Sequence, residues 1–398
     1  MTIKRYLVSA TLTATVLMLW GCNAVSHKAA PHPHAMPGKS HATQKEAVAD
    51  VSMMAVDLRN ANGLESILPA LFQARVVFVG EQHDNYGHHL AQLEVIKRLH
   101  QRNPNIAIGM EMFQRPFQQY LDDYLAGRIS EIEMLRKTEW YERWRFDYRL
   151  YQPILSYAKE HKLPVIALNL QREITRKVSQ GGIEGLTAEE KNLLPPEVDK
   201  SDKAYEGRLR SIFGLHPNSE KRNFDYFVES QLLWDETMAE QVANYLQDNP
   251  QHQMVVVAGN GHLMYGSGIP NRVTRRINVE RAIVLPGDAQ KAAPDVADFL
   301  IYPPDRSLPK AGLMGLLMNS VERGISVEEV IAGSGAEKAG LKKGDLLTQI
   351  DGQTIKSATD VRLQMLNKKP GDKIQVSVIR KKLLFGEEAM DVEIELGE

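Results

Sequence analysis

With 398 residues, the chain is long enough to form two or more domains. Apolar residues make up 43% of the sequence and charged residues 25%, which are ordinary fractions for a globular protein. The formal net charge is −2 and no basic stripe is present, which argues against a nucleic-acid partner.

The N-terminus has the pattern of a bacterial lipoprotein signal. A basic start precedes an apolar stretch, Leu7 to Trp20, that is too short to span a bilayer comfortably. The stretch runs into Leu-Trp-Gly-Cys, which resembles a lipobox, and Cys22 is the only cysteine in the chain. We expect residues 1–22 to be a signal peptide and Cys22 to carry a lipid anchor; a cleaved signal with an incidental cysteine is the alternative. By resemblance to other lipoproteins, Asn23 favours the outer membrane of a Gram-negative bacterium, facing the periplasm or the cell surface.

The middle of the chain reads as one α/β domain. Residues 23–50 lack periodicity and predict a flexible tether, and residues 301–311 predict a linker. Between residues 51 and 300, helical patterns separate apolar runs, which predicts a mostly parallel sheet flanked by helices. Two long helix-rich inserts, residues 114–160 and 171–249, predict a large helical cap over the sheet edge. The apolar runs that predict strands are Val76–Val79, Ile106–Met110, Val165–Leu168, Met254–Ala258 and Arg281–Leu285.

Acidic and imidazole side chains follow three of these runs. Glu81 and His83 come after the first, Glu111 after the second and His262 after the fourth. Because parallel strands place their carboxyl ends on one edge, we expect the four side chains to gather there. The set suits a divalent metal, or general acid–base catalysis without a metal. The alternative is that they are hydrogen-bonded groups that close the strand ends. Arg272 could pair with the carboxylates or hold an anionic group.

Four separated stretches, taken together, resemble the ChaN family of haem-binding lipoproteins, part of the haem-binding-uptake and Tiki superfamily. The resemblance covers about Leu64 to Leu285 and implies a haem-binding protein of iron acquisition that forms a dimer. The wider superfamily contains the Tiki metal-dependent proteases and the erythromycin esterases, whose shared Glu and His residues match Glu81, His83, Glu111 and His262. The stretches are VVFVGEQHDNYGHHLAQLEVI, GMEMFQRPFQQYLDDYLAG, LPVIALN and VVVAGNGHLMYGSGIPNRV.

The resemblance implies a tyrosine ligand for the haem iron with a histidine nearby, but maps it to no single position. Haem iron accepts either residue type. The candidates for haem contact are His262 with its neighbour Tyr265, the tyrosines Tyr148 and Tyr151 of the aromatic insert, and Arg272. The chain has no CxxCH motif, which excludes covalent attachment of the c type.

The C-terminal part, residues 312–398, resembles a bacterial PDZ domain of the HtrA type. The stretch SGAEKAGLKKGDLLTQIDGQTI carries the likeness, followed by a predicted helix at Asp360–Leu366 and a predicted strand at Lys373–Arg380. Asp351-Gly352 predicts a hairpin turn. The resemblance implies a groove that binds the C-terminus of another protein by strand addition. The expected carboxylate-binding loop consists of Gly312, Leu313, Met314, Gly315 and Leu316.

Three functions are therefore open. The first is a non-enzymatic, lipid-anchored haem-binding protein with a PDZ peptide-binding module. The second is a metal-dependent hydrolase in which Glu81 or Glu111 activates a metal-bound water and His83 and His262 are ligands. The third is an adaptor that acts mainly through the PDZ groove. A homodimer is an expected assembly in the first case.

Overall fold

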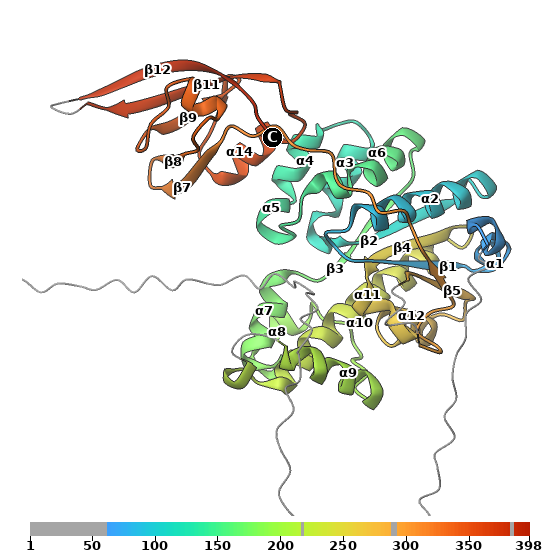
Figure 1. Cartoon of the computed structure of the whole chain (residues 1–398). Helices are drawn as coiled ribbons and strands as arrows, with labels where there is room; N and C mark the ends of the chain where they lie inside the picture. The colour runs from blue at the N-terminus through green and yellow to red at the C-terminus, as the bar shows by residue number, and fades with distance from the viewer. Residues whose placement is uncertain (1–61, 216–218, 288–292, 383–385) are drawn as a thin grey trace, which may run out of the picture.

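The computed structural model describes residues 62–215, 219–287, 293–382 and 386–398. It has an α/β part that extends to residue 301 and a β-rich C-terminal part (Figure 1). This arrangement confirms the predicted fold class. Cys22 and the tether predicted at residues 23–50 lie outside the described residues. No helix within the described ranges is both long and apolar enough to cross a membrane.

The central sheet has six strands in the order β3-β2-β4-β1-β5-β6, and every neighbouring pair is parallel. The five predicted strands are confirmed. No sequence pattern predicts β6, because three residues are too few to show a period. Since all six strands run the same way, their carboxyl ends share one edge. The strands are β1 (Val76–Glu81), β2 (Ile106–Gln114), β3 (Val165–Asn169), β4 (Gln253–Gly259), β5 (Arg281–Pro286) and β6 (Phe299–Ile301).

Both faces of the sheet are buried, each under its own helical layer. Val77 and Val79 of β1 point into a core under one layer, whereas Val76 and Phe78 point into a second core on the opposite face. Burial on both faces explains why the strands read as continuous apolar runs. The first layer contains α1 (Leu68–Gln73) and α2 (Tyr86–Arg102); the second contains α12 (Ile269–Arg276) and the long α10 (Phe224–Asp248).

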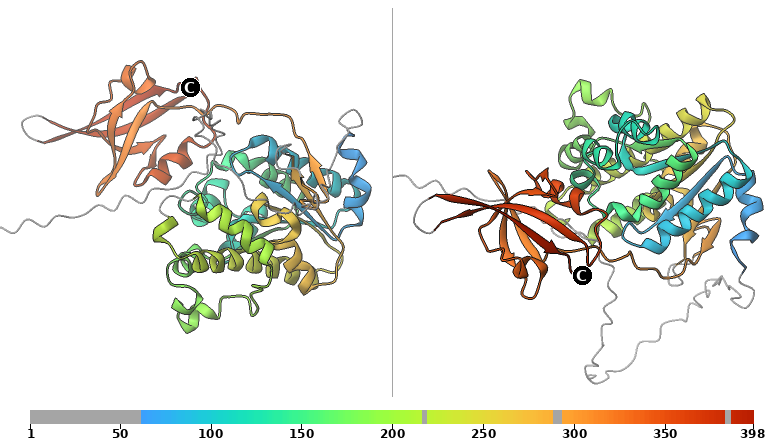
Figure 2. Two further views of the ribbon diagram at one scale, coloured as in Figure 1. Left: turned by 60° about the horizontal axis from the view of Figure 1, so that its bottom comes forward. Right: turned by 90° about the horizontal axis from the view of Figure 1, so that it is seen from above.

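Two helical inserts follow β2 and β3, as predicted (Figure 2). The first insert is rich in aromatic residues, and Trp140, Tyr148 and Tyr151 are fully buried in the core on the α2 side. Its aromatic density is therefore largely ordinary packing. The first insert contains α3 (Gln118–Leu125), α4 (Glu131–Lys137), α5 (Trp140–Arg143) and α6 (Gln152–His161). The second contains α7 (Arg172–Gly181), α8 (Ala188–Lys191), α9 (Lys203–Gly214) and α10, and the short α11 (Asn260–Leu263) follows β4.

The C-terminal part is an antiparallel sheet in the order β12-β11-β9-β8-β7, with β10 paired to β9. Asp351 and Gly352, with φ angles of 48° and 74°, form the predicted two-residue turn between β9 and β10. The elements are β7 (Leu316–Val321), β8 (Gly324–Val330), α13 (Gly335–Lys338), β9 (Leu346–Ile350), β10 (Gln353–Thr354), α14 (Ala358–Met365), β11 (Lys373–Lys381) and β12 (Glu387–Glu395).

The two parts touch. Helix α14 lies against α4 of the first insert (Figure 1). The connecting segment after β6 is also fastened to that insert, because Arg149 donates to the carbonyl of Pro309 at 2.9 Å and Leu308 packs on the α2-side core. The segment predicted as a linker is thus partly packed on the α/β part.

The packing of Gly335 gives a test of the C-terminal fold. A Cβ at this position would lie 1.9 Å from the carbonyl oxygen of Glu395, which is backbone and cannot move aside cheaply. We expect Gly335→Ala to lower the free energy of unfolding by about 2 kcal/mol or more, in urea unfolding followed by circular dichroism. Gly207→Ala in α9 is the matched control, since nothing lies within 4 Å of its added Cβ. Equal stability of the two variants would contradict this packing.

Candidate functional site

The shared edge of the sheet brings Glu81, His83, Glu111 and His262 together. Glu81 pairs in register with Gly259, so the ends of β1 and β4 lie side by side. The Gly259 N–H donates to Glu111 Oε2 at 2.7 Å. A Cβ on Gly259 would lie only 2.8 Å from the His83 ring. A glycine is therefore required where the histidine and the second carboxylate approach the chain.

Glu81 is the buried centre of this edge, with 1% of its surface exposed. Burial alone would raise its pKa, but hydrogen bonds and charge from His89 and His83 hold the pKa well below its usual value. A buried carboxylate is stable only when its oxygens are satisfied. The groups within bonding distance are His83 Nδ1 at 2.6 Å, His89 Nδ1 at 2.9 Å, the Tyr151 hydroxyl at 2.9 Å and Gln92 Nε2 at 3.1 Å.

His83 is the more accessible partner of Glu81. Its Nδ1 is held by the Glu81 carboxylate, and its side chain is 31% exposed. The ring lies against Trp144 and Phe146, with centroids 4.8 and 5.1 Å away. Burial lowers its pKa, but the bond to Glu81 and the charge of Glu111 outweigh burial and raise the pKa overall. The electrostatic surroundings therefore favour positive charge at this imidazole.

His262 lies between two carboxylates. Its Nδ1 is 2.7 Å from Asp235 Oδ1 and its Nε2 is 3.4 Å from Glu111 Oε1. Burial opposes the charged form, but Glu111 and Asp235 raise the pKa of His262 to about 9. Asp235 also accepts a hydrogen bond from the Tyr205 hydroxyl at 2.5 Å. Asp235 thus holds Nδ1 of His262, and Nε2 lies within ion-pair distance of Glu111.

The two buried tyrosines predicted to contact haem each donate a hydrogen bond to a carboxylate. Tyr148 donates to Glu131 at 2.9 Å, and Tyr151 donates to Glu81. Burial and the adjacent carboxylates raise the pKa of both phenols well above 10. Iron ligation by tyrosine needs the phenolate, so the positions of these two side chains disfavour that role and point to positioning roles instead.

Arg272 and Tyr265 differ in burial and in the groups that surround them. Arg272 is 3% exposed and donates to Glu236 and to the backbone carbonyl of Gly268, so it stabilises the fold and does not face the Glu81–His83 pair. Tyr265 is partly exposed and has a left-handed backbone, with φ 60° and ψ 10°. The Arg208 guanidinium lies 4.4 Å over its ring. A strained non-glycine residue beside His262 is a candidate for a functional position.

Two polar groups at this edge lack partners. The Gln171 side-chain oxygen and the Asn260 side-chain oxygen are buried without a hydrogen bond among the described residues. Such groups are rare and often face a ligand or ordered water. In the same described ranges, no group of three or more His, Cys, Asp or Glu side chains is arranged to hold a metal ion.

Sequence reasoning missed two members of the site. Gln92 lies on α2, one turn after His89, and this helical spacing after the first strand is the signal that could have placed it beside Glu81. Asp235 lies in the middle of α10, and nothing local marks it as the partner of His262. Only the packing of α10 on the sheet brings it there.

The expected peptide groove lies between the edge strand β7 and α14, which are in contact. Leu316, Met318 and Met365 are partly buried along it. Gly312 and Leu313 use their N–H groups within the domain, bonding to the carbonyls of Lys368 and Gly397. Among the described residues, the expected carboxylate-binding role therefore narrows to the Met314–Leu316 part of the loop, where Gly315 has a φ of 80°.

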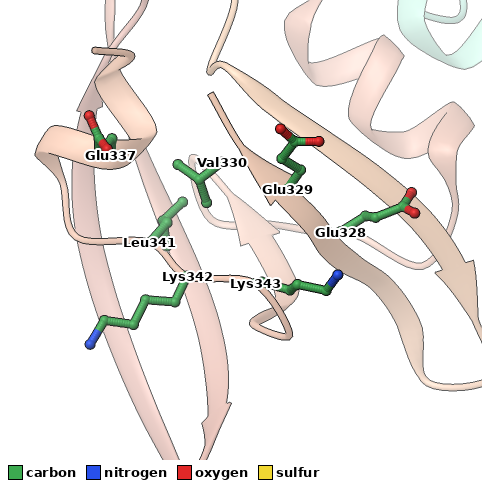
Figure 3. Close-up of a pocket in the computed structure, with 7 residues that line it drawn as sticks. All are labelled: Glu328, Glu329, Val330, Glu337, Leu341, Lys342 and Lys343. Carbon is green, nitrogen blue, oxygen red and sulfur yellow. The ribbon is translucent and has the colours of Figure 1, made fainter. Parts of the chain in front are cut away.

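A separate cavity of about 440 Å³ lies on another side of the C-terminal part, between β8, α13 and the following loop (Figure 3). Lys343 of the loop extends toward the side of Glu328 and Glu329 of β8, whereas Lys342 points away from them. Both signs of charge line this cavity, in contrast to the apolar groove. Its lining residues are Glu328, Glu329, Val330, Glu337, Leu341, Lys342 and Lys343.

Comparison with known protein families shows to which family the chain belongs. The model of the family described as haem-binding uptake, Tiki superfamily, ChaN matches residues 67–273, more than half of the chain. The chain belongs to the ChaN family. A PDZ domain model matches residues 312–396, so a PDZ domain follows the ChaN domain.

Individual relatives agree with both domains. The chain is 25% identical over 282 residues to RETICULATA-RELATED 5 of Arabidopsis thaliana, a chloroplastic protein, covering 64% of this chain and 37% of that protein. The PDZ domain is 38% identical over 60 residues to the periplasmic serine endoprotease DegQ of Escherichia coli, covering 15% of this chain and 13% of DegQ. The chain thus spans well under half the length of these relatives.

A solved structure shares the fold of the ChaN domain. ChaN of Campylobacter jejuni, whose structure shows cofacial haem binding, is 21% identical, with a TM-score of 0.50. The match covers 61% of this chain and 93% of that one. At this identity the likeness concerns the fold alone.

The two carboxylates around His262 predict a pH dependence of stability for the ChaN family domain. The pKa of the His262 imidazole is 6.5 in an unfolded chain and about 9 in the folded protein. Between these values the folded state binds the extra proton, so the stabilisation is full below the lower value and is lost as pH rises through the higher one. We expect the free energy of unfolding to fall by about 2 kcal/mol between about pH 7 and pH 10 because of this group.

Urea unfolding across that pH range measures the effect. In His262→Gln, the free energy of unfolding should depend less steeply on pH, because the titrating imidazole is gone. His161→Gln, at the exposed end of α6, is the matched control and should keep the wild-type slope. A slope that His262→Gln leaves unchanged would show that this histidine does not carry the proton.

Proposed function

We propose that the chain binds haem at the carboxyl edge of its ChaN-domain sheet, with His83 Nε2 as the ligand to iron. The observation that carries the proposal is the Glu81–His83 pair. Metal-binding histidines usually give their other ring nitrogen to a carboxylate, which fixes the ring and raises its basicity. Glu81 holds Nδ1 of His83 at 2.6 Å, and the side chain remains partly exposed.

The surroundings of His83 suit a flat apolar group. Trp144 and Phe146 provide aromatic surface next to the imidazole. Haem iron is an electrophilic centre that takes an axial imidazole. The charge of Glu111, which favours a proton on His83, favours a cationic metal centre at the same place. Of the three candidate tyrosines, Tyr265, with Arg208 over its ring, is the one that is not fully buried.

The wider cellular role belongs to the same proposal. We infer a lipid anchor at Cys22, an outer-membrane location and a role in haem or iron uptake from the N-terminal pattern and the family. Assembly as a homodimer is part of this role. The PDZ domain supplies a second binding function, the capture of a free protein C-terminus with apolar last residues along β7. The exposed edge of β7 and the apolar side chains of Leu316, Met318 and Met365 support it.

Haemin titration of the full-length chain tests the iron ligand. We expect wild type to develop a Soret band at micromolar haemin. Glu81→Gln should weaken haemin binding by about 10-fold or more, because it loosens the carboxylate that orients the imidazole. His83→Ala should weaken it at least as much and change the spectrum.

The controls separate the candidate ligands. His161→Ala removes a histidine on the surface of α6 and should bind haemin as wild type does. Tyr265→Phe should retain the imidazole signature. If His83→Ala binds with an unaltered spectrum while Tyr265→Phe does not, tyrosine is the ligand and the assignment to His83 is wrong.

Hydrolysis is the second candidate, favoured by the same pair of side chains. A carboxylate that holds Nδ1 of an imidazole leaves Nε2 to accept a proton from water, as a general base does. We expect such an activity to appear on a panel of esters and peptides and to drop by about 100-fold or more in His83→Ala. Equal inertness of wild type and variant would remove this candidate.

A further inference from the structure

Helix α14 of the PDZ domain has two functional faces. Val361 and Met365 pack into the PDZ core beside the peptide groove. Leu363 and Leu366, which are 1% and 4% exposed, instead join the α2-side core of the ChaN domain. A helix that closes a peptide groove on one side is therefore part of the hydrophobic core of the neighbouring domain on the other.

Polar contacts fix α14 to the first insert as well. The Arg136 guanidinium of α4 donates to Asp360, whose other oxygen caps the start of α14 by accepting from the N–H groups of Lys356 and Ser357. Gln152 Nε2 donates to Asn367 Oδ1 at 3.2 Å, just beyond the end of the helix. The ion pair at Asp360 thus links the cap of the groove helix directly to α4.

One short stretch of the ChaN domain connects α14 to His83. This stretch, residues 139–145, is called the bridging segment. On the PDZ side, Tyr141 lies under the Arg362 guanidinium at 5.5 Å, and Glu142 accepts a hydrogen bond from Thr359. On the other side, Trp144 lies 4.8 Å from the His83 ring. The segment therefore touches the groove helix and the proposed iron ligand at once.

The bridging segment is conformationally special at both ends. Glu139 and Arg145 have positive φ angles of 52° and 74°, a region that non-glycine residues seldom occupy. Trp140, inside the segment, packs on Tyr151 with ring centroids 5.5 Å apart, and Tyr151 donates to Glu81. Strain of this kind persists only where the surrounding packing imposes it, and it marks segments that can switch.

We propose that peptide binding in the PDZ groove and haem binding at His83 are coupled through the bridging segment. A peptide strand added along β7 packs against α14, and α14 cannot shift without disturbing Leu363, Leu366 and the contacts at Tyr141 and Glu142. The same segment positions Trp144 and, through Tyr151, the Glu81 carboxylate. A partner protein with a free apolar C-terminus would thereby alter haem affinity on docking. This inference rests on the proposed haem function.

The test measures haemin affinity of the full-length chain with and without a decapeptide that ends in two leucines and a free carboxylate. We expect saturating peptide to change the haemin Kd by about fivefold or more. By linkage, saturating haemin should change the peptide Kd by the same factor. The same peptide with an amidated end should have no effect, because the loop at Met314–Leu316 would lose its anion.

Two arginine variants test whether the contact between Arg136 and Asp360 carries the coupling between peptide binding and haemin binding. Arg136→Gln removes the ion pair to Asp360 and should remove most of the coupling while leaving haemin binding in the absence of peptide. Arg128→Gln removes an exposed ion pair with Asp123 in the same insert and should leave the coupling intact. Equal coupling in both variants would overturn the role of the Asp360 contact.

A second readout distinguishes failure of coupling from failure of haem binding. Peptide alone should change the amide hydrogen exchange of residues 139–145 in wild type and not in Arg136→Gln. If haemin fails to bind but exchange changes, the haem function is wrong and the link between groove and bridging segment stands. If the peptide does not bind, or binds without altering either readout, the coupling is overturned.

Discussion

A single buried carboxylate organises the functional edge of this protein. Glu81 is almost fully withdrawn from water and is stable only because histidine, tyrosine and glutamine side chains from three elements converge on it. Removing such a group from water costs several kcal/mol unless its oxygens are satisfied. The satisfied carboxylate in turn fixes the ring of His83. The position of the proposed iron ligand is therefore a consequence of how β1, α2 and the first insert pack together.

The aromatic residues of the first insert divide into two roles that the packing makes clear. Trp140, Tyr148 and Tyr151 are core residues, and the hydroxyl groups of the two tyrosines donate to the half-buried Glu131 and to the buried Glu81. Trp144 and Phe146 lie at the margin of that core and form surface beside His83. A continuous apolar structure thus extends from the sheet to the site, so that changes in the packing of the insert are felt at the imidazole.

The PDZ domain is joined to the ChaN domain by more than a linker. Its α14 contributes two leucines to the ChaN-domain core and an ion pair to α4. Domains connected only by a flexible segment move independently, whereas a shared hydrophobic contact makes the displacement of one a perturbation of the other. The junction therefore puts α14 in contact with the same insert that packs beside the Glu81–His83 pair.

Local sequence patterns were enough to predict five of the six strands of the central sheet and the edge at which the site lies. Continuous apolar runs predicted five strands, and the rule for parallel sheets placed Glu81, His83, Glu111 and His262 together, because both depend on local pattern and on a general property of the fold. The partner of each of these groups depends instead on how distant elements pack in the folded chain. Asp235 of α10 bonds to His262, and Tyr151 of the first insert bonds to Glu81. Leu363 of the PDZ domain packs in the core of the ChaN domain. These partners are far apart in the chain, and no local pattern encodes the packing that brings them within bonding distance.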